Sequence, residues 1–314
     1  MSAPTGARDN AKSDRECGNT DRDFGARSVT VAKSAGFCFG VQRAVDQVYR
    51  MAEEKKGNIC TLGPIIHNEE VIRDLEQKGV RVISEEDIPS LKDTTVIIRS
   101  HGVGKAVYDL LEENHVPFVD VTCPFVLKIH KIVREESAAG KYIVIIGDKD
   151  HPEVKGICGW CLGPYSVLKN VSEAMEFSPP PHTKVCVVSQ TTFNYNNFQE
   201  LVEILGKKRY DNDVLDILSI VNTICSATEL RQREARAIAG EADTMLVIGG
   251  RSSSNTQKLF EICKKECGNT YYIQTPVDLD SEMFQCSSYV GITAGASTPK
   301  KIIEEVQEHV RIEF

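Results

Sequence analysis

Short apolar runs alternate along this chain with longer stretches in which apolar residues recur at helical spacing. Runs rich in Val, Ile and Leu, bounded by glycine or polar residues, predict buried strands. The strands predicted in this way are Thr30–Ala32, Ile59–Leu62, Val96–Arg99, Phe118–Val121, Tyr142–Ile146, Val185–Ser189, Met245–Ile248 and Val290–Thr293. Amphipathic stretches between them predict helices, including Val41–Glu54, Val126–Ser137, Glu229–Ala239 and Lys258–Lys265. This alternation predicts an α/β protein of parallel sheets flanked by helices.

A single cysteine placed just before a helical stretch occurs three times. The copies are SAGFCFGVQRAV around Cys38, DVTCPFVLKI around Cys123 and NTICSATELRQ around Cys225. A strand followed by glycine and a polar loop also recurs, as LGPIIHN, IGDKDHP and IGGRSSSN. A third element follows in the same order, as IIRSHGV, VVSQTT and GITAGAS. Recurrence of three elements in one order indicates an internal threefold repeat.

The spacing of the first two elements supports the repeat. Their separation is 25 residues in the first copy and 24 in each of the others, from Cys38 to Gly63, Cys123 to Gly147 and Cys225 to Gly249. We therefore predict three α/β modules around a pseudo-threefold axis, with the carboxyl ends of their strands facing one shared cavity. The expected modules are 28–122, with the C-terminal segment 299–314 packing back on it, 123–222 and 223–298.

Residues 1–27 predict a disordered tail. They carry five acids and five bases among Ser, Gly, Thr and Asn, without an apolar stretch. Such a composition cannot bury enough surface to fold, and it does not match a secretory signal. The formal net charge of −8 argues against nucleic acid or an anionic membrane as a partner. A cytoplasmic location is therefore expected.

Eleven cysteines indicate metal or redox chemistry, because structural disulfides are rare in a reducing compartment. The three repeated cysteines lie 85 and 102 residues apart, so only folding can bring them together. Cysteine thiolates are the usual ligands of iron–sulfur clusters, and three of them would leave one iron of a [4Fe–4S] cluster open. A zinc site built from the same three cysteines is the alternative, although structural zinc prefers four ligands.

The other cysteines are weaker candidates for metal ligands. Cys17 falls in the tail, and Cys158 and Cys161 form a CGWC sequence that looks like a loop rather than a thioredoxin-type strand–helix junction. The remaining ones are expected in the core or on a shared helix face: Cys60, Cys186, Cys263, Cys267 and Cys286.

Polar loop tips between strands and helices predict an anion site. They contain His67–Asn68, Ser100–His101–Gly102, Ser253–Ser254–Asn255 and Ser297–Thr298–Pro299, and His151 lies on the equivalent loop of the second copy. Each tip alone is explained by helix capping. Together they would direct several helix N-termini at one centre, which is how phosphate groups are bound without a P-loop. The sequence contains no nucleotide-binding glycine motif.

Glu153 is a candidate general acid. It follows His151 by two residues in a loop bounded by Gly147 and Gly156. Burial beside an anion site would raise the pKa of its carboxyl, which could then remain protonated near neutral pH. A solvated glutamate at the start of a helix is the alternative.

These motifs together resemble those of the IspH/LytB family, the 4-hydroxy-3-methylbut-2-enyl diphosphate reductases. The resemblance spans residues 29 to about 310 and rests on GFCFGVQRAV, GPIIHN, RSHGV, TCPFV, GDKDHPEVKG, SQTT, ICSATELRQ, GGRSSSNTQKL and GITAGAS. It implies a trefoil around a [4Fe–4S] cluster held by Cys38, Cys123 and Cys225. It also implies reduction of the allylic diphosphate to isopentenyl and dimethylallyl diphosphate, with electrons from a one-electron donor such as ferredoxin or flavodoxin.

The resemblance assigns roles to individual residues. It implies that Glu153 and Thr191 deliver protons, with Gln190 and Thr228 in support. The residues implied to bind the substrate are His67, His101, His151, Thr191, Ser253, Ser254, Asn255 and Ser297. Two other classes remain as alternatives: a quinolinate-synthase-like enzyme, which also has a three-cysteine cluster in a threefold fold, and a non-catalytic zinc-binding protein.

Overall fold

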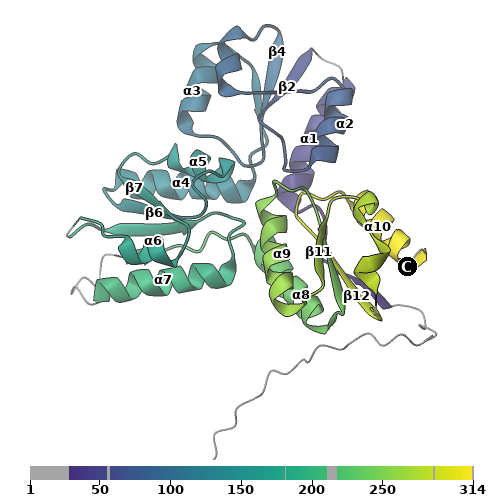
Figure 1. Cartoon of the computed structure of the whole chain (residues 1–314). Helices are drawn as coiled ribbons and strands as arrows, with labels where there is room; N and C mark the ends of the chain where they lie inside the picture. The colour runs from purple at the N-terminus through teal and green to yellow at the C-terminus, as the bar shows by residue number, and fades with distance from the viewer. Residues whose placement is uncertain (1–27, 55–56, 181, 211–217, 286, 313–314) are drawn as a thin grey trace, which may run out of the picture.

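The computed structural model describes residues 28–54, 57–180, 182–210, 218–285 and 287–312. The tail expected at 1–27 lies outside these residues, as do Cys17 and Cys286. The described chain forms three lobes around a common centre (Figure 1). None of the described helices is both long enough and apolar enough to cross a membrane.

Each lobe contains one four-stranded parallel sheet, and the three sheets share one strand order. The first sheet runs β3 (Arg81–Ile83), β2 (Asn58–Leu62), β4 (Thr94–Ile98), β5 (Phe118–Asp120). The second runs β7 (Tyr165–Leu168), β6 (Tyr142–Ile146), β8 (Val185–Ser189), β9 (Leu218–Ile220). The third runs β11 (Thr270–Ile273), β10 (Thr244–Ile248), β12 (Tyr289–Ala294), β1 (Ser28–Val31). The predicted α/β repeat is confirmed in this topology.

The helices repeat in the same way. One helix begins at each repeated cysteine: α1 (Phe39–Glu54), α4 (Pro124–Ala138) and α8 (Ser226–Glu241). A second helix in each lobe follows the first inner strand of its sheet. These helices are α2 (Glu69–Gln77) after β2, α5 (Pro152–Cys158) after β6 and α9 (Ser254–Glu266) after β10. A third set follows the next inner strand: α3 (Lys105–Glu113), α7 (Tyr195–Tyr210) and α10 (Lys300–Ile312). The remaining pieces are α6 (Val171–Glu176) and the short 3₁₀ turns η1 (Glu85–Ser90), η3 (Pro276–Asp278) and η4 (Ser281–Phe284).

The N-terminal strand completes the third sheet, which corrects one expected boundary. A first module of 28–122 includes β1, but β1 pairs with β12 in parallel, Val29 opposite Val290. The C-terminal helix α10, expected to pack on the first module, packs instead on this third sheet through Ile302, Val306 and Val310. β1 and α10, the first and last described elements, therefore belong to one lobe, and β1 closes the threefold repeat although it lies far from β12 in the sequence.

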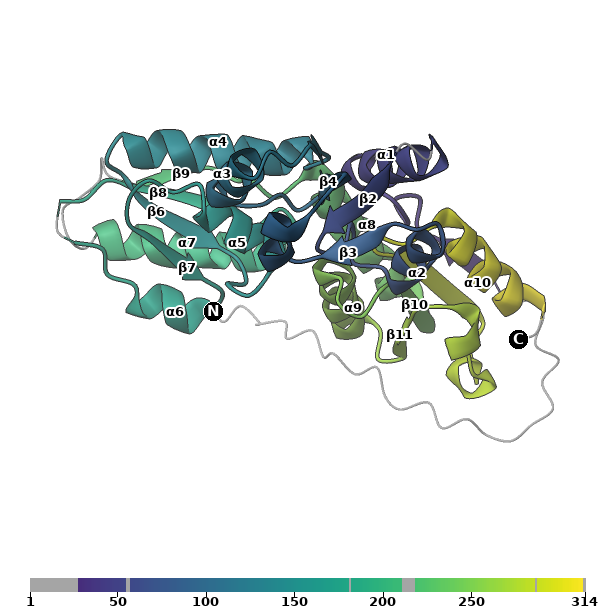
Figure 2. The ribbon, with the colours of Figure 1, turned by 90° about the horizontal axis from the view of Figure 1, so that it is seen from above.

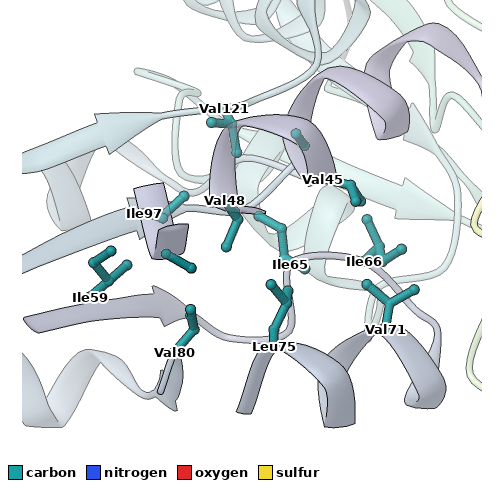
Figure 3. Packing of buried hydrophobic residues seen from close by; sticks show 12 residues of the cluster. Val45, Val48, Ile59, Ile65, Ile66, Val71, Leu75, Val80, Ile97 and Val121 are labelled. Atoms are coloured by element: carbon teal, nitrogen blue, oxygen red, sulfur yellow. The ribbon is translucent and has the colours of Figure 1, made fainter. Parts of the chain in front are cut away.

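Apolar layers on both faces of each sheet hold the lobes together. On one face of the first sheet, Val45 and Val48 of α1 pack with Leu75 of α2 against Ile59 and Ile97 of the strands (Figure 3). A separate cluster covers the opposite face of this sheet. Each buried Val, Leu or Ile contributes about 1.5–3 kcal/mol relative to exposure. The inner strands are therefore fixed firmly, and with them the loops at their carboxyl ends.

The strands that the sequence failed to predict all lie at sheet edges. These are β3, β7, β9 and β11. In β3, two of the three residues are exposed, whereas four of the five residues of β2 are buried. An edge strand covers less of the core, so it does not need the uninterrupted apolar run that reveals an inner strand.

Candidate active site

The same backbone bond positions each repeated cysteine. Every one of the three donates its amide N–H to a carbonyl in the loop that follows the inner strand of the adjacent sheet. The pairs are Cys38 to Ala296 (3.3 Å), Cys123 to Ser100 (3.0 Å) and Cys225 to Thr191 (3.1 Å). These acceptors belong to the third repeated element, so the three modules present their cysteines in equivalent ways. Each sulfur sits where a helix begins, and the three helices α1, α4 and α8 meet at the centre (Figures 1 and 2).

The three thiols face one another. A Cβ atom added to Gly40 would lie 2.5 Å from Sγ of Cys123, so only glycine allows the helix after Cys38 to approach this closely. Burial, together with the nearby sulfurs of Cys38 and Cys225, raises the pKa of Cys123 to about 11. Burial likewise raises the pKa of Cys225. Deprotonation of these thiols therefore requires a cationic group between them, which is what a bound metal provides.

The spacing of the sulfurs distinguishes a cluster from a single ion. Among the described residues, one group of potential metal ligands has all its ligand atoms within 4.8 Å of one another, and it consists of His67, His101 and His151. The three cysteine sulfurs do not form such a group, so at least one pair of them is further apart. Ligands of one tetrahedral zinc, at about 2.3 Å from the metal, would be about 3.8 Å apart. The cysteines fit a larger polynuclear group better than one ion.

A single cavity joins the cysteines to the predicted anion site. It is lined by residues of all three lobes, including every residue that the sequence assigned to metal, substrate or proton transfer: Cys38, His67, His101, Cys123, His151, Glu153, Thr191, Cys225, Ser253, Ser254, Asn255 and Ser297. Thr228 also lines it. Gln190 lies behind this wall, where its Nε2 donates to Oγ1 of Thr192 at 3.0 Å.

Three imidazoles form one side of the cavity. The ring centroids of His67 and His101 are 4.4 Å apart, and each lies 5.5 Å from that of His151. Burial lowers the pKa of all three, to about 4 for His151. They are therefore neutral at pH 7. Nε2 of His67 and Nδ1 of His101 are buried without a hydrogen-bond partner. Such atoms are costly unless a ligand satisfies them.

The hydrogen bonding of His151 favours an anion over a metal at these imidazoles. His151 caps α5, and the amide N–H of Glu153 donates to its Nδ1 at 3.1 Å. Because Nδ1 accepts, Nε2 carries the proton and can only donate. A metal at Nε2 would require the proton to move to Nδ1 and break the cap. The histidines are thus suited to donate hydrogen bonds to an anion.

Hydroxyl and amide groups of the third lobe complete the anion site. Ser253 caps α9, and its Oγ lies 3.4 Å from Oγ of Ser297. Ser297 also donates to the carbonyl of His67 at 3.0 Å, which joins the first and third lobes. Oδ1 of Asn255 accepts the amide N–H of Ala296 at 2.9 Å, while its Nδ2 is buried without a partner. The amide is therefore fixed with its donor free for a ligand.

Glu153 is buried and held by Thr191. Only 1% of Glu153 is exposed. Its Oε1 accepts the amide N–H of Thr191 at 2.6 Å, and the Thr191 hydroxyl lies 2.7 Å from Oε2. Burial raises the pKa of Glu153 to about 7, although both bonds to Thr191 oppose the shift. This carboxyl is therefore an acid suited to neutral pH, as expected for a proton donor.

Gly40, Thr192 and Arg231 are among the residues of the cavity wall that sequence reasoning missed. All three belong to quoted motifs, GFCFGVQRAV, SQTT and ICSATELRQ. The close approach of Gly40 to Cys123 could have been suspected from glycine at a helix start. Nothing in the sequence separates Arg231 from the exposed arginines of the same helix, yet only 4% of it is exposed.

The fold and the site define a class of protein: a trefoil of three α/β lobes whose shared cavity is lined by three cysteines and by a group of polar side chains suited to an anion. The family model described as LytB protein matches residues 29–311, and the chain belongs to this family.

Individual proteins that are similar to this chain support its membership of the family. The chain is 46% identical over 285 residues to a 4-hydroxy-3-methylbut-2-enyl diphosphate reductase of Caldanaerobacter subterraneus subsp. tengcongensis, covering 90% of this chain and 96% of that protein. Two solved structures are similar. The E-1-hydroxy-2-methyl-but-2-enyl-4-diphosphate reductase of Plasmodium falciparum has a TM-score of 0.83 at 27% identity, covering 92% of this chain and 88% of that one. An (E)-4-hydroxy-3-methyl-but-2-enyl diphosphate reductase has a TM-score of 0.64 at 38% identity, covering 91% and 99%.

Proposed function

We propose that this protein reduces 4-hydroxy-3-methylbut-2-enyl diphosphate to isopentenyl and dimethylallyl diphosphate, the terminal reaction of the non-mevalonate isoprenoid pathway. In this reaction the bond between C4 and its hydroxyl oxygen breaks, two electrons and two protons are added, and water leaves. One observation carries the proposal: a single cavity contains three thiols, three neutral imidazoles and a buried acid with a pKa of about 7. The family membership and the names of its relatives support the same activity.

Cys38, Cys123 and Cys225 would hold a [4Fe–4S] cluster. Their shared cavity and their positions at three helix N-termini suit an anionic polynuclear group. When bound, such a cluster supplies single electrons and an open iron that acts as a Lewis acid. The cysteines that the structure describes are all free, which fits a reducing, cytoplasmic compartment.

The diphosphate would bind on the polar side of the cavity. His67, His101 and His151 are neutral donors, and the N-cap Ser253 and the loop residue Ser297 add hydroxyls. Ser254 and Asn255 contribute from the first turn of α9. Neutral donors and helix dipoles bind a multiply charged anion without adding fixed cations to the cavity. The allyl group would then extend toward the cysteines, with its C4 hydroxyl near Thr191.

Glu153 would deliver the proton through Thr191. Oε1 of Glu153 accepts the Thr191 amide N–H, and Oε2 accepts the Thr191 hydroxyl. When the carboxyl is protonated, its proton would sit on Oε2 and this second bond would reverse, with Glu153 donating to the Thr191 hydroxyl. The hydroxyl can then pass its own proton into the cavity, which Thr191 lines. This arrangement explains how an acid that is 1% exposed reaches the substrate. Protonation turns the departing hydroxyl into water, and such general acid catalysis contributes about 10²–10⁴-fold. Electrons would come from a one-electron donor such as ferredoxin or flavodoxin.

Anaerobic purification and assay test the proposal. We expect about four irons and four sulfides per chain, broad visible absorbance, and conversion of the allylic diphosphate to both products with dithionite and methyl viologen as reductant. A colourless protein that carries zinc would overturn it in favour of a binding protein. A cluster-loaded protein that leaves the allylic diphosphate unchanged would overturn it in favour of another three-cysteine enzyme, such as one resembling quinolinate synthase.

A further inference from the structure

Arg231 is a buried cation in the wall of the cavity. It lies on α8, six residues after Cys225, and only 4% of it is exposed. Its Nη2 donates to the carbonyl of Gly36 at 2.6 Å and its Nη1 to that of Ala227 at 3.3 Å, whereas Nε has no partner. Both acceptors are neutral. A buried guanidinium bound only to carbonyl groups requires a negative charge nearby.

The groups whose negative charge would act on Arg231 include two sulfurs that would bind the cluster, and these line the same cavity. Burial lowers the pKa of Arg231, and the groups that act against this shift are Cys38, Cys225 and Glu234. Glu234 keeps its charge while its two carboxylate oxygens accept the amide N–H groups of Lys33 and Ser34 at 2.8 and 2.9 Å. The counter-charges of Arg231 are therefore Glu234 and, once the cluster is bound, two thiolates and the group they hold.

Arg231 also anchors the loop that delivers Cys38. Gly36 has a positive φ of 98°, which favours glycine, and its carbonyl is bound by the guanidinium. Glu234, one turn further along α8, holds the start of the same loop at Lys33 and Ser34. Helix α8 thus fixes the first cysteine while carrying the third one at its own N-terminus.

We propose that Arg231 favours the reduced state of the cluster held by Cys38 and Cys225. This inference rests on the proposed function, because it requires the cluster. One-electron reduction adds one negative charge and no proton, so a buried cation beside the ligands stabilises the product more than the reactant. For charges about 10 Å apart at an effective dielectric constant of about 20, Coulomb's law gives a change of about ten-fold in the equilibrium constant. Arg231 is a positioning and charge-balancing residue, and it does not itself react.

Redox titration of the cluster-loaded protein with dithionite, followed by visible absorbance and electron paramagnetic resonance, provides the test. The electron comes from dithionite, which is oxidised. Arg231→Met removes the charge and keeps the length of the side chain. Arg231→Lys keeps the charge but loses the planar guanidinium group that binds two carbonyls at once. Glu234→Gln removes a negative charge from the same loop anchor. Arg233→Gln is the matched control, because Arg233 is exposed on the same helix and solvent screens its charge.

We expect Arg231→Met to lower the equilibrium constant for reduction about ten-fold, which is about 59 mV for a one-electron couple. Arg231→Lys should stay within about two-fold of the unsubstituted protein, and Arg233→Gln should not change the constant. Glu234→Gln should shift the constant slightly in the opposite direction, because a negative charge is lost. If the loss of the anchor rather than the charge were responsible, Arg231→Met, Arg231→Lys and Glu234→Gln would all shift it in the same direction, which would overturn the proposal.

Failure of this inference can be told apart from failure of the proposed function. An unchanged midpoint potential in Arg231→Met, with iron and sulfide at the level of the unsubstituted protein, would refute the charge role alone. Absence of iron and sulfide from the unsubstituted protein would refute the proposed function. If Arg231→Met fails to fold, Arg231→Lys and Glu234→Gln still decide the question, since a same-sign shift in both contradicts a charge effect.

Discussion

The cysteine end and the polar end of the cavity use the threefold repeat in opposite ways. At the cysteine end, all three modules supply the same residue with the same backbone bond, from Cys38, Cys123 and Cys225. At the polar end, equivalent loops have diverged. The loop after the first strand of each repeat carries His67, His151 or Ser253. Glu69 and Glu153 each follow the histidine of their loop by two residues, but only Glu153 lines the cavity, where it is buried.

This difference reflects the symmetry of the two groups that would bind, the cluster at the cysteine end and the substrate at the polar end. A cubic cluster presents equivalent corners, so three equivalent thiolates can bind it. A substrate with a diphosphate at one end and a hydroxyl at the other has no such symmetry, so its binding groups cannot be alike. The repeat therefore specifies the centre, and divergence of the loops specifies the chemistry. Substitutions at the two ends should accordingly fail in different ways.

Loss of one cysteine should have the largest effect. Cys225→Ser removes a soft thiolate ligand and leaves only two, so we expect loss of the visible absorbance and of all measurable turnover while the chain remains folded. Absorbance, iron content and circular dichroism of anaerobically purified protein measure this. Cys158→Ser is the control, because Cys158 is a half-exposed thiol of the second module that does not line the cavity. Equal cluster content in the two variants would remove Cys225 from the ligand set.

Glu153→Gln should reduce turnover about 10²–10⁴-fold and leave the cluster in place. Glutamine copies the protonated carboxyl, since its oxygen can accept the Thr191 amide N–H and its amide can face the Thr191 hydroxyl. Only the transferable proton is lost, so KM should change little. Steady-state rates with a chemical reductant, beside iron content, test this prediction. Glu135→Gln, an exposed acid on α4, serves as control. Near-normal turnover in Glu153→Gln would eliminate its acid role.

Much of this centre could be predicted from the sequence because the repeat marks it. Inner strands show uninterrupted apolar runs, and the three cysteines stand at equivalent positions in the three copies. The pairing of β1 with β12 could not be predicted in this way, because a strand that closes a repeat from the other chain end has no local signal. Arg231 was missed for a different reason. Its burial depends on the loop at Gly36, which lies 195 residues away.

Asn255→Ala should weaken substrate binding without removing the acid or the cysteines. The free Nδ2 of Asn255 would lose its bond to the anion, and Ala296 would lose its acceptor. One such charge-assisted bond is worth about 1.5–3 kcal/mol, so we expect KM to rise at least about ten-fold. The matched control is Asn170→Ala, which removes a similar amide cap at α6, outside the cavity. If KM rose equally in both variants, the effect would be one of stability and not of binding.

The smallest predicted effect is on stability and follows from the raised pKa of Glu153. The folded carboxyl has a pKa of about 7 against an ordinary value of 4.5. Between these values the folded state binds more protons than the unfolded one, so the stability contributed by this group is present below pH 4.5 and is lost as pH rises through 7. At 1.36 kcal/mol per pKa unit the loss amounts to about 3 kcal/mol.

Comparison with Glu153→Gln isolates this loss, because every other titrating group is common to both proteins. In anaerobic thermal unfolding at one scan rate, we expect the unsubstituted protein to lose about 5 °C more in Tm than Glu153→Gln between pH 5 and pH 8. A parallel pH dependence of the two Tm values would show that the carboxyl is already ionised in the folded state at pH 5. The polar end of the cavity would then lack its neutral acid, and the proposed division of roles between its two ends would fail at this residue.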